Sequence, residues 1–112
     1  MKKYFQLNIR FHHPFKEPLT TKTTPEPHKK LYFKKEDTLP EILPVKTTYT
    51  FDNKATHGSM VTGHVFYEQT NIFITVIDHL RALPIETMND TVRLLLENGW
   101  TKGELRKNEE EK

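Results

Sequence analysis

The stretch from Met60 to Ile77, MVTGHVFYEQTNIFITVI, constrains the fold of this chain more than any other. Two runs rich in β-branched and aromatic residues, 61–67 and 72–77, flank the polar linker Glu68-Gln69-Thr70-Asn71. This pattern predicts a β-hairpin with a four-residue connection. The second run is apolar on both faces, so it predicts an interior strand. Gly63 interrupts the first run and predicts a bulge or a close backbone approach.

Alternating side chains predict further strands before this hairpin. Over residues 3–11 the apolar side chains of one face alternate with the polar and aromatic side chains of the other: Phe5, Leu7, Ile9 and Phe11 against Tyr4, Gln6, Asn8 and Arg10. Such alternation is typical of a half-buried strand. Leu31-Tyr32-Phe33 predicts a short edge strand flanked by lysines, and the alternation over 45–51 predicts another strand.

A helix is predicted from about Met88 to Asn98. Thr87 is the expected N-cap, with Asp90 as the third residue of a weak capping box. The apolar stripe consists of Met88, Val92, Leu95 and Leu96, with Leu94 off the stripe. Gly99 stands where a positive φ ends a helix, and Trp100 is expected to close the helix end against the sheet.

The expected architecture is a β-rich α+β domain over residues 1–103. It consists of about five strands and one C-terminal helix, arranged as a small, partly closed barrel of the PUA-like type. Residues 12–30 contain four of the seven prolines and four lysines, which predicts a long extended Pro/Lys-rich loop. Residues 104–112 form a charged tail, expected to be frayed.

Composition narrows the location and the partners. The chain has no cysteine, its apolar runs are too short to cross a bilayer, and its basic start leads into an alternating pattern. We therefore expect a cytoplasmic protein without a signal peptide and without a membrane partner. Residues 1–35 carry nine Lys or Arg against Glu17 and Glu26. This local charge of +7 suits a polyanion, although a Lys-rich solvated loop is an equally ordinary explanation.

No motif indicates catalysis, a cofactor or a metal. The six histidines lack the spacing of a zinc site. Ser59 has His57 nearby but no nucleophile elbow, and no phosphate-binding glycine loop is present. His64 is placed to form an acid/base pair with Asp78 or Glu68, although any hairpin brings such neighbours together. We therefore expect a protein that is not an enzyme.

Basic residues interleaved with aromatic residues form the remaining constellation. Cations neutralise phosphates and aromatic rings stack on bases, so this combination is typical of proteins that bind single-stranded nucleic acid. The candidate nucleic-acid-binding residues are Tyr4, Arg10, Lys16, Lys22, Lys29, Lys30, Lys34, Lys35, Tyr67 and Arg81.

The order of predicted elements favours some RNA-binding folds over others. Residues 63–67, GHVFY, are only distantly similar to the central RNP motif of an RRM, and the helix that an RRM needs after its first strand has no counterpart here. A PUA-like or OB-like barrel agrees better with the strand count.

From MKKYFQLNIRFHHPFKEP at the start to DHLRALPIETMNDTVRLLLENGW near the end, the chain resembles the small PrgU-like proteins of pheromone-responsive conjugative plasmids in length, order and composition. The resemblance implies a PUA-like fold and an RNA-binding regulator that restrains expression of conjugation genes. It transfers no functional residue. The rival hypothesis is a protein-binding accessory or inhibitor from a phage or mobile element, in which the Pro-rich loop or the edge near 31–33 docks by strand addition.

Overall fold

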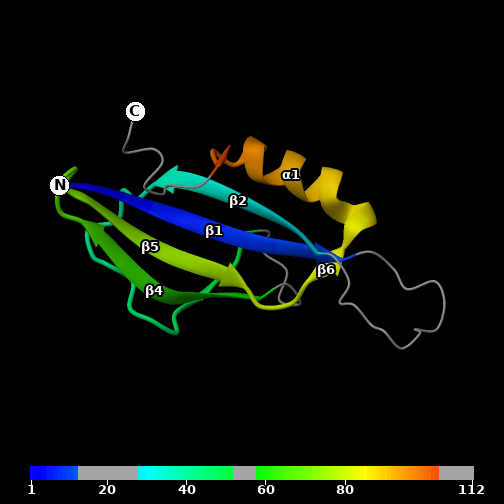
Figure 1. The fold of residues 1–112 in the computed structure, drawn as a ribbon, viewed down its shortest axis with the longest axis horizontal. Coiled ribbons are helices and arrows are strands. Elements are labelled where there is room, and N and C mark those ends of the chain that lie inside the picture. Colours follow the sequence, from blue (N-terminus) through cyan, green and yellow to red (C-terminus); the bar gives the residue numbers. More distant parts are fainter. Residues whose placement is uncertain (13–27, 52–57, 104–112) are drawn as a thin grey trace.

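A curled β-sheet and a C-terminal helix make up the computed structural model, which describes residues 1–12, 28–51 and 58–103 (Figure 1). The four long strands are β1 (Lys2–His12), β2 (His28–Glu36), β4 (Ser59–Tyr67) and β5 (Ile72–His79). Three strands of two residues extend the sheet: β3 (Thr48–Tyr49), β6 (Leu83–Pro84) and β7 (Thr101–Lys102). A 3-10 turn, η1 (Ile85–Thr87), leads into α1 (Met88–Glu97). The β-rich α+β class with a partly closed barrel is confirmed.

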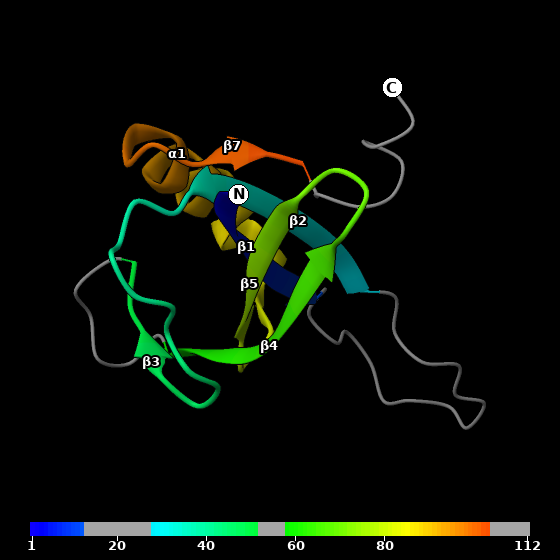
Figure 2. The same cartoon turned by 90° about the vertical axis from the view of Figure 1, so that its left-hand side faces the viewer.

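The strand order is β3-β4-β5-β1-β2-β7, and β6 pairs with the end of β1. β1 is antiparallel to β2 and parallel to β5, which makes it a central strand. Viewed from its end, the sheet curls from β2 through β1, β5 and β4 toward β3 (Figure 2). We call the side that this curl encloses the inner face and the opposite side the outer face.

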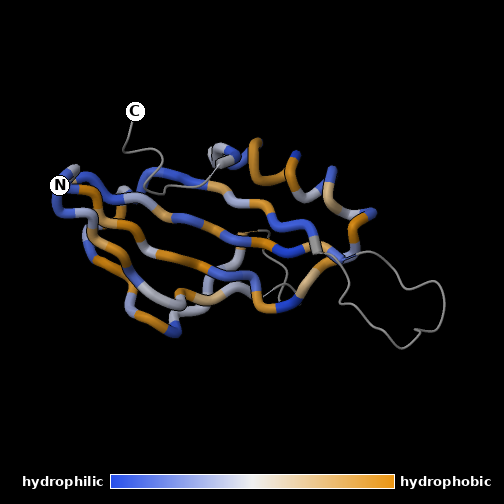
Figure 3. Tube along the Cα trace, viewed as in Figure 1, coloured by the Kyte–Doolittle hydropathy of each residue, from blue (hydrophilic) through white to orange (hydrophobic). Residues whose placement is uncertain are grey.

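The inner face carries the hydrophobic core. Apolar and polar residues alternate along β1 (Figure 3), so every second side chain of this strand enters the core. The buried members are Phe5, Leu7, Ile9, Phe11, Leu31, Phe33, Val61, Ile77, Leu95 and Trp100. α1 and the segment 37–51 close the core, because Val92, Leu43 and Tyr49 pack against it.

The predicted hairpin and interior strand are confirmed. β4 and β5 pair from Ser59 with His79 to Tyr67 with Ile72, and β5 lies between β4 and β1. The register shifts between Val61 and Gly63, which is the bulge expected at this glycine.

The limits of the Pro/Lys-rich loop and of one predicted strand are corrected. His12 belongs to β1, and His28, Lys29 and Lys30 belong to β2, so only residues 13–27 of the loop remain, outside the described residues. Lysines have low strand propensity, but they are common on strands near a sheet edge. The strand expected over 45–51 shrinks to Thr48–Tyr49, since Lys46 has φ 81° and breaks the extended backbone.

The helix begins at Met88 as predicted and ends with the predicted backbone motif, but the predicted capping hydrogen bonds at its start are absent. Gly99 has φ 92°, and the Trp100 and Gly99 amides donate to Leu95 and Leu96. These two bonds form a Schellman motif, which directs buried Trp100 into the core. The capping box is wrong, because the Thr87 hydroxyl donates to the Pro84 carbonyl and accepts no hydrogen bond from a helix amide.

The predicted apolar stripe of the helix is partly wrong. Leu95 is buried, and Met88 and Val92 pack on the core, but Leu96 is 50% exposed. α1 runs along the β2 side of the sheet (Figure 1), so only a narrow strip of its surface meets the core. Leu96 lies outside that strip.

Candidate functional site

The outer face of the four long strands is the candidate site. α1 and the segment 37–51 pack on the inner face, so in the described part of the chain neither element covers the outer one. Residues that are partners in neighbouring strands share a face, which identifies the outer-face residues from the pairing registers. They are Tyr4, Gln6, Asn8 and Arg10 on β1, Lys30, Tyr32, Lys34 and Glu36 on β2, Ile72, Ile74, Val76 and Asp78 on β5, and Val65 and Tyr67 on β4.

One half of this outer face is apolar. Ile74 is only 2% exposed although it does not belong to the core cluster. Its strand partners Tyr4 and Val65 and the nearby Tyr67 and Val76 lie on the same face. These side chains form a small second apolar patch at the hairpin end of the sheet.

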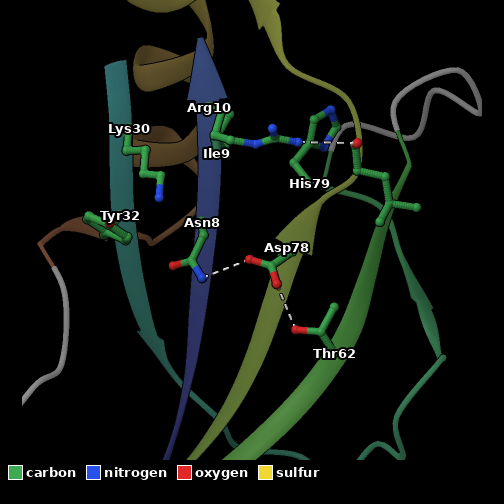
Figure 4. Close-up of a pocket in the computed structure, with 9 residues that line it drawn as sticks. Asn8, Ile9, Arg10, Lys30, Tyr32, Thr62, Asp78 and His79 are labelled. Carbon is green, nitrogen blue, oxygen red and sulfur yellow. Dashed lines mark hydrogen bonds between the residues drawn. The ribbon is translucent and has the colours of Figure 1, made fainter. Parts of the chain in front are cut away.

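The other half contains a polar pocket of about 430 Å³ (Figure 4). Its lining comes from β1, β2, β4, β5 and the turn after β5: Asn8, Ile9, Arg10, Lys30, Tyr32, Thr62, Asp78, His79 and Leu80. Its volume lies within the range of about 300 to 1,000 Å³ that is usual for small-molecule sites.

A hydrogen-bond network forms the floor of the pocket. Asn8 Nδ2 donates to Asp78 Oδ1 at 2.8 Å, and Thr62 Oγ1 donates to Asp78 Oδ2 at 2.8 Å. Gln6 Nε2 in turn donates to Asn8 Oδ1 at 3.1 Å. Figure 4 shows Asn8, Asp78 and Thr62 in a row across β1, β5 and β4. The network fixes the orientation of these polar groups before any ligand arrives.

Two cations border the pocket. Arg10 and Lys30 are strand partners, and both side chains are exposed. Arg10 Nη2 donates to the Leu80 carbonyl at 3.5 Å. Within residues 1–12, 28–51 and 58–103, neither cation forms an ion pair with a carboxylate. Their charges are therefore available to an anionic ligand.

The structure divides the candidate residues from the sequence into three groups. Tyr4, Arg10, Lys30, Lys34 and Tyr67 share the outer face. Lys29 and Lys35 project from the other side of β2, and Arg81 is exposed in the turn after β5. Lys16 and Lys22 lie outside the described residues.

Lys35 has a structural environment of its own. Its Nζ lies 5.5 Å from the centre of the Trp100 ring, a cation–π contact, and its Cε lies against Gly99. Lys35 thus packs at the end of α1, away from the pocket.

Asn8, Tyr32, Thr62 and Asp78 line the pocket and were absent from the predicted set. The alternation through Arg10 places Asn8 on the same face, and a similar alternation through Lys30 places Tyr32 there. No local signal connects either residue with Thr62 or Asp78.

The acid/base pair considered for His64 is not formed, and His57, the residue noted near Ser59 in the sequence, lies outside the described residues. His64 is on the inner face, where its ring nitrogen contacts the Leu43 carbonyl at 2.9 Å and its ring stacks on Phe73. Ser59 Oγ instead lies 2.8 Å from His79 Nδ1, and the two residues are 1% and 2% exposed. Such burial leaves no room for a substrate at Ser59, so we interpret this bond as a tie between β4 and β5.

The described residues contain neither a metal-binding cluster nor a helix able to cross a membrane. No group of three or more His, Cys, Asp or Glu side chains gathers where it could hold a metal ion. No helix in the same part of the chain has the length and hydropathy needed to cross a bilayer. Comparison of the chain with protein-family models, curated proteins and solved structures gave no match.

Proposed function

We propose that the outer face binds single-stranded RNA and that the protein is an RNA-binding regulator without catalytic activity. One observation carries this proposal. Arg10 and Lys30, two exposed cations with no carboxylate partner among the described residues, border a pocket that also presents an aromatic ring and pre-oriented polar groups.

Each part of the pocket has a role in this proposal. Arg10 and Lys30 neutralise phosphates, which supplies the affinity that does not depend on sequence. The Tyr32 ring offers a surface on which an unpaired base stacks. Asn8 and Asp78 offer donors and acceptors to the edge of that base, as single-stranded RNA recognition requires.

The regulatory part of the proposal follows from the resemblance to the PrgU-like proteins. That resemblance implies a PUA-like fold, RNA as the ligand and conjugation genes as the regulated target. The local charge of +7 over residues 1–35 is compatible with RNA as a partner.

The rival hypothesis, a protein-binding accessory, has two docking places, of which the Pro-rich loop lies outside the described residues and the edge near 31–33 is already paired. Strand addition was expected near 31–33, but β7 already pairs with Phe33 and Lys34, and the Gly103 amide donates to the Tyr32 carbonyl. A strand from another protein would have to displace β7 there.

The decisive experiment compares two adjacent lysines on opposite faces of β2. Fluorescence anisotropy would follow labelled single-stranded RNA, duplex RNA and DNA titrated with wild type, Lys30→Glu and Lys29→Glu. Both side chains are exposed, and both substitutions change the net charge equally. We expect Lys30→Glu to weaken RNA binding about tenfold or more. The slope of the logarithm of the binding constant against the logarithm of the salt concentration should become shallower by about one, the value for one lost phosphate contact.

The Lys29→Glu protein is the matched control, and it should bind within about twofold of wild type at equal salt. Equal losses in the two variants would mean that overall charge, and not the outer face, governs binding. Flat titrations with every nucleic acid would overturn the proposed function itself.

A further inference from the structure

The edge of β4 that faces away from β5 has strand or backbone partners only over residues 59–61. β3 pairs with Ser59 and Met60, and backbone bonds from Lys46 and Thr47 reach Val61. From Gly63 to Tyr67, no other strand in the described residues pairs with this edge. A row of main-chain donors and acceptors is therefore left open to another strand.

Apart from the bulge at Gly63, the same edge lacks the charged residues and proline that usually prevent strand pairing. β4, with the sequence SMVTGHVFY, contains no proline and no Lys, Arg, Asp or Glu. Val65 is 39% exposed and Phe66 is 49% exposed. At the opposite side of the sheet, β2 carries four lysines and is partly covered by β7. The β4 edge is thus the unprotected one.

We propose that β4 pairs antiparallel with β4 of a second copy of this chain, about a two-fold axis at Val65. In this register Val65 lies opposite its own counterpart, His64 lies opposite Phe66, and Gly63 lies opposite Tyr67. Each contact occurs twice, as in any isologous interface. The proposal does not depend on the proposed RNA-binding function.

The side chains of this register complement one another. No atom lies within 4 Å of the position that a Gly63 Cβ would take, so the ring of Tyr67 from the second copy has room there. An aromatic ring across from a glycine is a favourable cross-strand arrangement in sheets. His64 and Phe66 form a second aromatic pair, and no like charges meet.

Neighbouring apolar residues enlarge the proposed interface. Ile42 and Val45 are exposed and belong to the segment that packs along β4 through Leu43 and Lys46. Pairing five residues and these neighbours still gives a small interface. We therefore expect a reversible dimer with a dissociation constant on the order of micromolar.

Self-pairing is favoured over a foreign strand by the absence of charge. A neutral strand meets no repulsion from its own copy, whereas the lysines of β2 would repel one another in the equivalent pairing. Because Val65 is the middle residue of the open stretch 63–67, a two-fold axis there pairs every residue of this stretch with another residue of the same stretch.

Sedimentation equilibrium of the full chain tests the proposal. Wild type should show a concentration-dependent dimer. Val65→Lys and Val65→Glu should each raise the dissociation constant at least about 100-fold, because like charges then meet at the axis. An equimolar mixture of the two variants should restore the dimer. Leu96→Lys, which alters an exposed apolar residue on α1, is the control and should dimerise as wild type does.

Circular dichroism would establish that each variant remains folded, as the partial exposure of Val65 predicts. A wild-type protein that stays monomeric up to about millimolar concentration would overturn the proposal and leave the edge to a foreign strand. Dimers that persist in Val65→Lys, or that dissociate in Leu96→Lys, would also overturn it.

Discussion

The two faces of β1 differ in how they are buried and in what they can do. On the inner face Leu7, Ile9 and Phe11 are completely buried in the core. On the outer face Asn8 is held by hydrogen bonds and Arg10 remains exposed. The same alternation of side chains thus supplies the core on one side and, on the other, the polar groups to which we assign RNA binding. Substitutions at adjacent positions should therefore have separable effects.

The largest expected effect tests the inner face. Phe33→Ala should lower the free energy of unfolding by about 3 to 5 kcal/mol, because it leaves a cavity in the core. Its neighbour Tyr32 points to the outer face, so Tyr32→Ala should cost less than about 1 kcal/mol. Urea denaturation monitored by Trp100 fluorescence measures both. Similar losses in the two variants would contradict the division between the faces.

The next effect tests the outer face through the same tyrosine. Tyr32→Ala should weaken RNA binding by about 1 to 3 kcal/mol, the contribution of one stacked base. Tyr32→Phe keeps the ring and should bind nearly as wild type does. Anisotropy titrations at fixed salt measure the difference. A loss of affinity in Tyr32→Phe would assign the role to the hydroxyl group and not to stacking.

A smaller effect concerns a polar group on the inner face. Thr75 is fully buried, and its Oγ1 has no hydrogen-bond partner within the described part of the chain. Thr75→Val should therefore raise the free energy of unfolding by about 1 kcal/mol, since it removes an unsatisfied hydroxyl at nearly constant shape. Denaturant unfolding tests this prediction. A destabilised Thr75→Val protein would show that the hydroxyl is satisfied.

The smallest effect is a pH dependence of the free energy of unfolding that is caused by Tyr49 in the core. Burial raises the pKa of Tyr49 above its usual value near 10, and its ring packs on Phe5 and Trp100. The unfolded chain therefore ionises this phenol first. The associated stability is present below the unfolded pKa and is lost as the pH rises through the raised folded pKa.

Tyr49→Phe cannot ionise at this position and serves as the control. The free energy of unfolding of wild type should fall more steeply than that of Tyr49→Phe as the pH rises above about 10. Denaturant unfolding on both sides of that pH measures the two slopes. Parallel slopes would exclude Tyr49 as the group responsible.

Several residues of the outer face could be predicted from the alternation and composition of the sequence. Which strands bring them together could not. Alternation placed Arg10 on a polar face, and the basic and aromatic composition identified Lys30 and Tyr67 as candidates. Assigning Lys30 to a loop was wrong because hydropathy underestimates a lysine-rich strand whose alternate residues, Leu31 and Phe33, enter the core.

The sequence by itself determined the elements whose signals are local. The central hairpin with its bulge at Gly63, the two faces of β1 and the helix end at Gly99 follow from side-chain period and backbone conformation within a few residues. Only the tertiary structure decided which faces meet. Asn8 reaches Asp78, 70 positions away, because β1 and β5 pair in parallel, and this register depends on the packing of the whole core.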